Sequence, residues 1–284
     1  MDIIWLIYNP RSRTADEALV AEIEAAFAQA GQPIKRRIEL GDGDLPSVAE
    51  LTDAGVTMLA ALSGDGSISA LASALDGWKG ALLVLPGGTM NLLSRALHGD
   101  APVLDIVARV TAGQGRRQTV PTIEHDGQNE VITAYTGIVA GPTAAWGEVR
   151  EDLRKGDLAA LGQDAVNAVS ATFQAPGVGL KDKGERYPAL FLEPGEGVVQ
   201  VSAVIVENPG HLLAHGWAWL MGDFRTGPFE TLAPAPEISL YSSGTQLELL
   251  VDGEQVEAGE PATFRAGRSA LHFVATQEGE PQSS

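Results

Sequence analysis

Two glycine-rich segments have the residue types that bind phosphate groups. They lie at 63–67 (SGDGS) and 86–91 (PGGTMN). Glycine lets the backbone approach a ligand closely and adopt unusual φ/ψ values, and the N–H groups at the start of a following helix attract an anion. One such loop is weak evidence. Two in succession, each containing a hydroxyl residue (Ser67 and Thr89), indicate a nucleotide phosphate site.

Both loops are expected at the ends of strands, because apolar runs precede them and helix-like segments follow. Strands that are buried on both faces are apolar throughout, and here they alternate with helices. This alternation predicts an α/β fold with a parallel sheet covered by helices on both faces. The expected elements are a strand at 3–8, a helix from the capping residues 14–17 to 30, a strand at 33–40, a short helix from a cap at 44 to 51, a strand at 56–62, a helix at 68–75, a strand at 81–85, and helices at 91–97 and 102–110.

The character of the sequence changes near residue 116, where runs of β-forming residues separated by turns replace the alternation. Such runs predict antiparallel β structure, and Asp126-Gly127 has the composition of a hairpin turn. The expected elements are strands at 119–124, 131–139, 189–192, 198–206, 238–242, 246–251 and 270–275, with one helix at 158–173. We therefore predict a nucleotide-binding domain at 1–117, a β-rich, sandwich-like domain at 118–277, and a frayed tail at 278–284.

The composition argues against several classes of protein. The 284 residues carry a net charge of −18, which disfavours nucleic acid partners and general adhesion to anionic membranes, because both need a positive field. There are no cysteines, so disulfides and thiolate metal sites are excluded, and a cytoplasmic location is expected. The first residues have neither a basic leader nor a cleavage site. No apolar run approaches the ~20 residues that are needed to cross a bilayer.

Four short segments make the chain resemble the catalytic domain shared by diacylglycerol kinases, sphingosine kinases and soluble bacterial lipid kinases. They occur in the family's order: NPxS at 9–12, SGDGS at 63–67, PxGTxNxxxR at 86–95 and VDGE at 251–254. Together the four are specific, although any one alone is not. NAD kinases and phosphofructokinases also contain a GDG loop. The nucleotide site is therefore better supported than the identity of the acceptor.

This resemblance implies an ATP-dependent lipid kinase with its site in a cleft between the two domains. Phosphoryl transfer needs positioned phosphates, a metal ion that neutralises charge, and a base for the acceptor hydroxyl. By matching, Asp65 faces the reacting centre and its Mg²⁺, while Glu254, with Asp252 beside it, is the base. The implied acceptor is a lipid such as diacylglycerol, reached by transient contact with the inner membrane surface. The residues implied at the nucleotide are Asn9, Arg11, Arg13, Gly64, Gly66, Ser67, Gly87, Gly88, Thr89 and Asn91.

Each of these motifs also has a purely structural interpretation. Asp65 lies between two glycines, where aspartate is a common turn former. Asp252-Gly253 has the composition of a two-residue hairpin turn, which leaves Glu254 as a solvated strand residue. Asn91 and Arg95 are four residues apart on an expected helix, so they could brace the loop and the helix rather than contact a ligand.

The chain departs from the family's pattern at 207–236. Bacterial relatives have a proline-rich segment with an Asp-Gly pair there, and its acid helps to hold a structural magnesium. Asp223 is the residue that could substitute for this acid. Two alternative functions follow: a kinase of the same fold acting on a small soluble acceptor, which the acidic composition favours, or an inactive nucleotide-binding regulatory protein, which the departure favours.

Overall fold

The computed structural model describes residues 2–12, 14–41, 45–127, 131–141, 177–180, 184–205, 229–242 and 246–277. The chain divides into two compact units, the first formed by Met1–Val120 with Arg268–Ser284 and the second by Pro121–Gly267. Five predictions lie outside the described residues: Arg13, the helix cap at 44, Asp223, the helix at 158–173 and the frayed tail. None of the helices in the described ranges is both long and apolar enough to cross a membrane.

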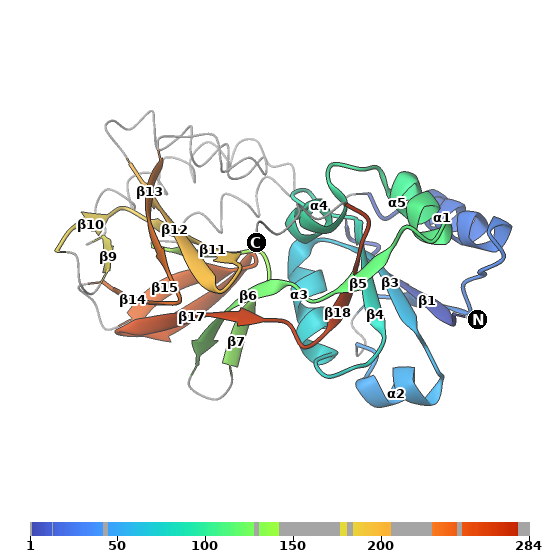
Figure 1. Cartoon of the computed structure of the whole chain (residues 1–284), viewed down its shortest axis with the longest axis horizontal. Helices are drawn as coiled ribbons and strands as arrows, with labels where there is room; N and C mark the ends of the chain where they lie inside the picture. The colour runs from blue at the N-terminus through green and yellow to red at the C-terminus, as the bar shows by residue number, and fades with distance from the viewer. Residues whose placement is uncertain are drawn as a thin grey trace, which may run out of the picture. The chain divides into compact units, whose positions relative to one another are not determined.

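The first unit is built on one six-stranded sheet with the order β2-β1-β3-β4-β18-β5 (Figure 1). Neighbouring strands are parallel, except that β5 runs antiparallel to β18. The predicted parallel sheet is thereby confirmed, with one antiparallel edge strand added. The strands are β1 (Ile4–Tyr8), β2 (Arg36–Glu39), β3 (Met58–Ser63), β4 (Ala81–Pro86), β5 (Arg116–Gln118) and β18 (His272–Ala275).

Helices cover this sheet, and every residue of its central strands β1, β3 and β4 is buried except Pro86, which is half-buried. Helices α1 and α5 lie side by side (Figure 1), and their apolar residues share one core with alternate residues of β1, β3 and β4. The intervening strand residues, such as Ile7 and Leu59, are fully buried as well, so the opposite face is also covered. The helices are α1 (Glu17–Gln29), α2 (Val48–Asp53), α3 (Asp65–Ala74), α4 (Leu92–His98) and α5 (Val103–Thr111).

Three helices begin at residues that differ from the predicted ones. Asp16, rather than Thr14, caps α1, because its side chain accepts a hydrogen bond from the Leu19 amide at 2.8 Å. Ser47 caps α2 by accepting from the Glu50 amide at 3.1 Å. Helix α3 begins at Asp65, three residues before the predicted start, so the first glycine loop is itself the first turn of a helix.

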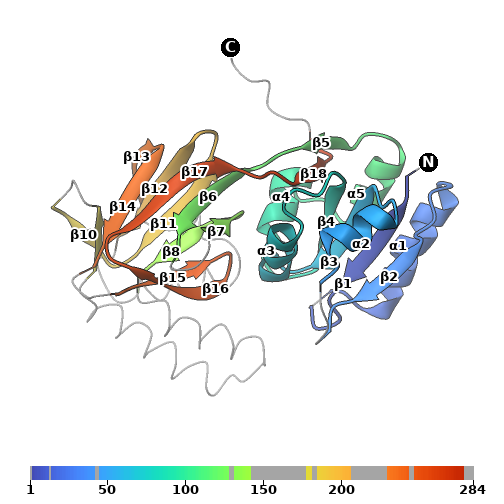
Figure 2. The same ribbon diagram turned by 90° about the horizontal axis from the view of Figure 1, so that it is seen from below.

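The second unit consists of two six-stranded sheets, ordered β10-β9-β14-β17-β6-β7 and β13-β12-β11-β8-β15-β16 (Figure 2). The first contains β6 (Pro121–Asp126), β7 (Val131–Ala134), β9 (Val178–Leu180), β10 (Arg186–Tyr187), β14 (Glu237–Tyr241) and β17 (Ala262–Arg268). The second contains β8 (Ile138–Ala140), β11 (Leu190–Gly195), β12 (Val198–Val204), β13 (Phe229–Ala235), β15 (Gln246–Val251) and β16 (Glu254–Gly259).

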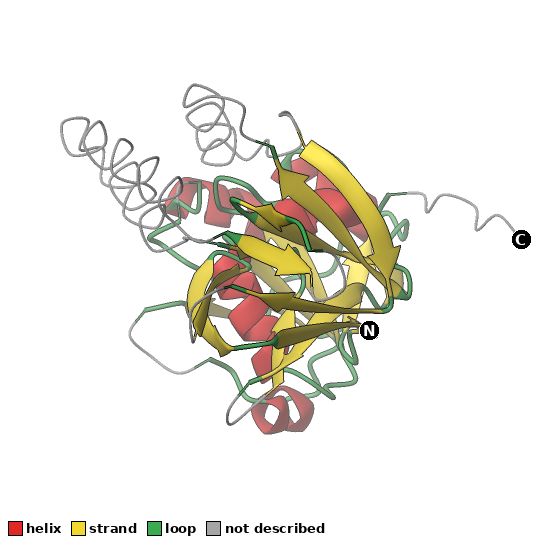
Figure 3. Ribbon diagram, turned by 90° about the vertical axis from the view of Figure 1, so that its left-hand side faces the viewer, coloured by secondary structure: helices red, strands yellow, loops and turns green. Residues whose placement is uncertain are grey.

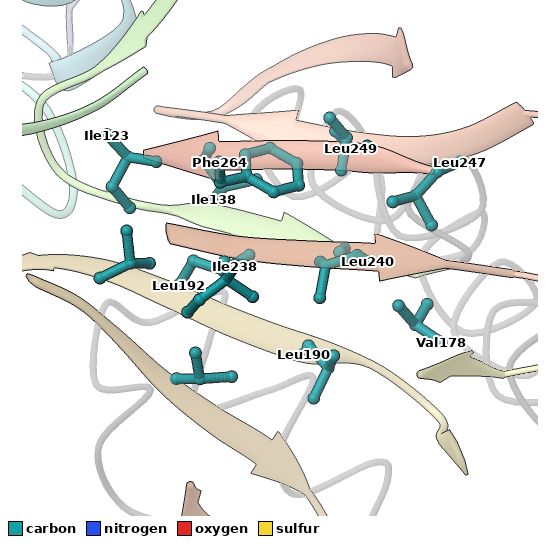
Figure 4. Packing of buried hydrophobic residues seen from close by; sticks show 14 of the residues in the cluster. Ile123, Ile138, Val178, Leu190, Leu192, Ile238, Leu240, Leu247, Leu249 and Phe264 are labelled. Atoms are coloured by element: carbon teal, nitrogen blue, oxygen red, sulfur yellow. The ribbon is translucent and has the colours of Figure 1, made fainter. Parts of the chain in front are cut away.

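The inner faces of these two sheets share one apolar core, so the predicted sandwich-like architecture is confirmed (Figure 4). Phe264 and Leu240 come from one sheet, and Leu192 and Leu249 from the other. All helices in the described part of the chain belong to the first unit. Figure 3 shows these helices in red and the strands in yellow. The strand predicted at 131–139 is interrupted at 135–137 and forms β7 and β8.

Candidate active site

Three loops are joined by hydrogen bonds at the carboxyl ends of β1, β3 and β4. The Asn9 amide donates to the Leu62 carbonyl at 3.1 Å, and the Asn9 side chain lies 3.4 Å from the Ser67 hydroxyl. The Thr14 amide donates to the Gly87 carbonyl at 3.3 Å. The loop that follows β1 is therefore attached to both glycine loops, and the three loops form one local structure.

The two glycine loops pack backbone against backbone. A Cβ atom on Gly88 would lie 2.6 Å from the Gly64 Cα, and one on Gly87 would lie 2.6 Å from the Ser63 nitrogen. Any side chain at these two positions would push the loops apart. The glycines at 87 and 88 are therefore required for the close approach of the two loops, whatever ligand the loops bind.

Asn91 holds the second loop in shape. Its backbone has a left-handed conformation, with φ at 50°. The side-chain oxygen accepts a hydrogen bond from the Gly88 amide at 2.7 Å, and the side-chain nitrogen donates to the Gly88 carbonyl at 3.0 Å. The Gly87 amide likewise donates to the Ser63 carbonyl at 3.1 Å. These amides have partners inside the protein, so in this arrangement they shape the loop.

Asp65 connects the first loop to the helix after the second. It is half-buried in the first turn of α3, and its carboxylate accepts a hydrogen bond from the Leu93 amide, at the start of α4, at 3.3 Å. No side chain caps α3 itself, whose N-cap residue is Gly64. An uncapped helix start presents N–H groups and a positive dipole end. The Ser63 hydroxyl is also buried at this point and has no hydrogen-bond partner among the described residues.

The remaining predicted nucleotide residues in the described ranges are accessible to solvent. Arg11 is exposed, and its amide donates to the Asn9 side chain at 3.0 Å. Thr89 is exposed, and Gly66 and Ser67 are half-buried.

Tyr8 lies directly before Asn9, and its hydroxyl oxygen is 2.7 Å from a carboxylate oxygen of Glu17 and 3.0 Å from one of Glu39. The hydrogen bond to Glu17 raises the pKa of this phenol, so Tyr8 is a neutral donor that ties β1 to α1.

Asp252 and Glu254 of the second unit have very different surroundings. Asp252 is buried, whereas Glu254 is exposed at the start of β16. The Asp252 carboxylate accepts hydrogen bonds from the amides of Tyr135, Thr136 and Gly137. This three-residue segment was not predicted from the sequence. The glycine at 137, inside an otherwise regular strand pattern, was the signal that could have revealed an interruption.

The described residues contain no group of three or more histidine or acidic side chains that could hold a metal ion. A magnesium ion that arrives with a nucleotide needs only one or two protein carboxylates, because phosphate and water supply the other ligands. Asp65, in the first glycine loop, fits that requirement, and no fixed protein cage is needed.

The chain is similar to known proteins in sequence over its first part and in fold over its whole length. Residues 3–123 match the family model described as the diacylglycerol kinase catalytic domain, and this range contains the first three of the four motifs. A solved structure described as a diacylglycerol kinase from Bacillus anthracis strain Sterne is 13% identical, with a TM-score of 0.61, covering 96% of this chain and 97% of that chain. No curated protein matches the sequence significantly.

Two further structures from the same strain are provisionally assigned as diacylglycerol kinases. One is 15% identical with a TM-score of 0.64, covering 96% of this chain and 95% of that chain. The other is also 15% identical, with a TM-score of 0.62, covering 100% of this chain and 99% of that chain. At such identities the similarity establishes the fold alone. Both units of the present chain fall within that fold.

Proposed function

We propose that this protein is an ATP-dependent kinase that phosphorylates a hydroxyl group of a lipid such as diacylglycerol, because residues 3–123 match the model of the diacylglycerol kinase catalytic domain. The observation that carries the proposal is the joined set of loops after β1, β3 and β4, with the uncapped start of α3 among them. N–H groups and a positive dipole end at a helix start are suited to phosphate.

Each residue has a role in this proposal. Gly64, Gly66 and Ser67 hold phosphate oxygens at the start of α3, and the buried Ser63 hydroxyl gains a partner there. Asn9, Arg11 and Thr89 contact the nucleotide from the other two loops. When bound, Mg²⁺ neutralises charge on the phosphates, and Asp65 is the carboxylate proposed to hold it. Gly87, Gly88 and Asn91 act indirectly, by fixing the shape of the loops.

The proposed reaction is a direct transfer. The acceptor oxygen attacks the γ-phosphorus, the bond from that phosphorus to the bridging oxygen breaks, and ADP leaves. Glu254 takes the proton of the acceptor hydroxyl. A positioned general base contributes ~10²–10⁴-fold to the rate of such a step. Glu254 suits this role because it is exposed, and no side-chain hydrogen bond occupies it among the described residues.

The proposal is tested by supplying the purified full chain with Mg²⁺ and γ-labelled ATP. The acceptors are diacylglycerol, monoacylglycerol and a sphingoid base, each in detergent micelles, with glycerol as a soluble acceptor. We expect transfer of label to a lipid. Asp65→Asn should reduce kcat at least 100-fold while the fold is retained, because the amide oxygen can still accept from Leu93. Full activity of this variant would contradict the assignment of Asp65.

A second candidate is a kinase of the same fold with a small soluble acceptor. The net charge of −18 favours it, since a lipid kinase must approach membranes that are often anionic. Label that appears only in the glycerol sample would support this alternative. ATP binding without transfer to any acceptor would instead support an inactive nucleotide-binding protein.

A further inference from the structure

Asp252 makes an unusually complete set of hydrogen bonds for a residue in a surface hairpin. One carboxylate oxygen accepts from the Thr136 amide at 2.8 Å, the Thr136 hydroxyl at 2.6 Å and the Gly137 amide at 3.0 Å. The other oxygen accepts from the Tyr135 amide at 2.8 Å. Three successive backbone amides that point at one anion form a nest, and here the anion is part of the protein.

A backbone hydrogen bond also joins Asp252 to this segment. The Asp252 amide donates to the Gly137 carbonyl at 3.0 Å, so this pair of residues is joined in both directions. Gly137 has a φ of 153°, and a Cβ atom there would lie 2.9 Å from the Leu192 carbonyl oxygen. Only glycine fits this position. The interruption between β7 and β8 is therefore a specific binding site for the Asp252 carboxylate.

The β15–β16 hairpin could form without burial of the Asp252 side chain. Asp252 and Gly253 both have positive φ values, 49° and 94°, and Val251 pairs with Glu254, which defines a two-residue turn. An exposed Asn-Gly or Asp-Gly pair makes such a turn equally well. Asp126, in the other Asp-Gly pair of this unit, is by contrast an exposed residue at the end of β6, and its carboxylate pairs with Arg265 at the surface. A buried carboxylate is costly unless it is fully hydrogen-bonded.

We propose that Asp252 is a positioning residue: by locking the β15–β16 turn onto the segment at 135–137, it fixes the direction of the adjacent Glu254. This inference rests on the proposed function, in which Glu254 is the base. It changes the role that the motif implies for Asp252. The Asp252 carboxylate is buried, and both of its oxygens already accept hydrogen bonds from the segment at 135–137, so it is poorly placed to receive a proton from the acceptor. Glu254 is exposed and accepts the proton instead.

The first experiment measures kcat, the KM for ATP and the pH profile with diacylglycerol micelles. Asp252→Asn should lower kcat 10- to 100-fold with an unchanged KM for ATP. It should retain the fall of kcat at acid pH that titration of a base produces. Glu254→Gln should lower kcat at least 100-fold and abolish that fall. The double variant should stay within about threefold of Glu254→Gln, because Asp252 acts through Glu254. Asp126→Asn is the matched control and should leave kcat unchanged.

Two outcomes would overturn the inference. Loss of the acid limb in Asp252→Asn would identify Asp252 itself as the base. A wild-type kcat in that variant would show that the hydrogen bonds of Asp252 to the segment at 135–137 do not contribute to catalysis. If Asp252→Asn fails to fold, Thr136→Val and Thr136→Ser replace it. Thr136→Val removes one of the four donors and should lower kcat about threefold or more, whereas Thr136→Ser keeps the hydroxyl and should restore it. Equal rates for these two variants would contradict the proposal.

A second measurement does not depend on activity. Amide hydrogen exchange at 135–137 should accelerate at least tenfold in Asp252→Asn, and it should be unchanged in Asp126→Asn and Glu254→Gln. Unchanged exchange in Asp252→Asn would show that Asp252 does not hold the segment at 135–137 in place, while leaving the kinase proposal intact. Conversely, a wild-type protein that transfers no phosphate to any acceptor would reject the proposed function, even if exchange at these amides responds as expected.

Discussion

The contact between Gly64 and Gly88 gives a sharp test at the scale of single residues, because the two glycines are not equivalent. A Cβ atom on Gly88 would lie 2.6 Å from the Gly64 backbone, but one on Gly64 would lie 3.5 Å from the Gly88 Cα, an ordinary contact. Gly88→Ala should lower the free energy of unfolding by ~1–3 kcal/mol, as overpacking does, and weaken ATP binding.

Gly64→Ala is the matched control and should cost less than ~1 kcal/mol. Gly41→Ala, with nothing within 4 Å of its added Cβ, should be neutral. Urea unfolding measures all three variants. If Gly64→Ala and Gly88→Ala lower the free energy of unfolding equally, the asymmetry of this contact has no energetic consequence.

The residue types predicted the positions of the loops correctly, but they did not predict the role of each residue within a loop. The glycines and Asn91 were recognised from their spacing, and the three loops do form one structure. The sequence left two roles open for Asn91, and the structure shows it bracing Gly88 through two hydrogen bonds. Side-chain direction depends on loop conformation, which local composition does not determine. The partners of Asp252 lie more than a hundred residues away, so no local pattern could reveal them.

At the scale of elements, β18 shows what a strand pattern leaves open. The apolar run at 270–275 predicted a strand correctly, and the sequence placed it in the second domain. In the structure it returns to the first unit and pairs with β4 and β5. Apolar periodicity identifies a buried strand but carries no information about its neighbours in the sheet. The edge strands β5 and β16 were not predicted for a related reason. Most of their residues are exposed and polar, so they lack the alternation of apolar and polar residues that identifies a strand.

His98 joins two of these elements and predicts a pH dependence of stability. It ends α4, is 1% exposed, and its Nδ1 atom lies 2.9 Å from the Thr276 hydroxyl just after β18. Burial lowers the pKa of His98 to about 4, and the nearby Arg109 charge acts in the same direction. The unfolded chain, with its ordinary value of 6.5, therefore binds the proton more readily between these two values. Stability should fall as the pH drops through this window, by up to about 3 kcal/mol.

Urea unfolding between pH 7.5 and 4.5, compared with His98→Asn, checks this prediction. The variant lacks the titrating group, so its stability should depend less on pH than that of the wild type. At pH 7.5 the variant is expected to be the less stable protein, and the difference should shrink at pH 4.5. His272→Asn, at an exposed position of β18, should keep the wild-type dependence. Parallel pH curves for wild type and His98→Asn would rule out a lowered pKa at this site.

At the scale of the whole molecule, the net charge bears on how the proposed lipid acceptor would be reached. The net charge of −18 repels an anionic surface, and no helix in the described ranges provides a membrane span. A lipid kinase of this composition therefore has to extract its acceptor from a surface of low charge density, or from one whose field is screened by salt. The Debye length is ~30 Å at 0.01 M salt and ~8 Å at 0.15 M, so ionic strength separates these cases.

Vesicle flotation of the full chain with phosphatidylcholine and diacylglycerol, with and without phosphatidylglycerol, provides this test. Association should be weaker with the anionic vesicles at ~0.01 M salt and should recover towards the neutral-vesicle value at ~0.15 M, because screening removes the repulsion. Apolar contacts do not weaken with added salt, so association with neutral vesicles should change little. Stronger binding to anionic vesicles at low salt would mean that a local basic surface outweighs the net charge. Absence of binding to either vesicle would instead favour a small soluble acceptor.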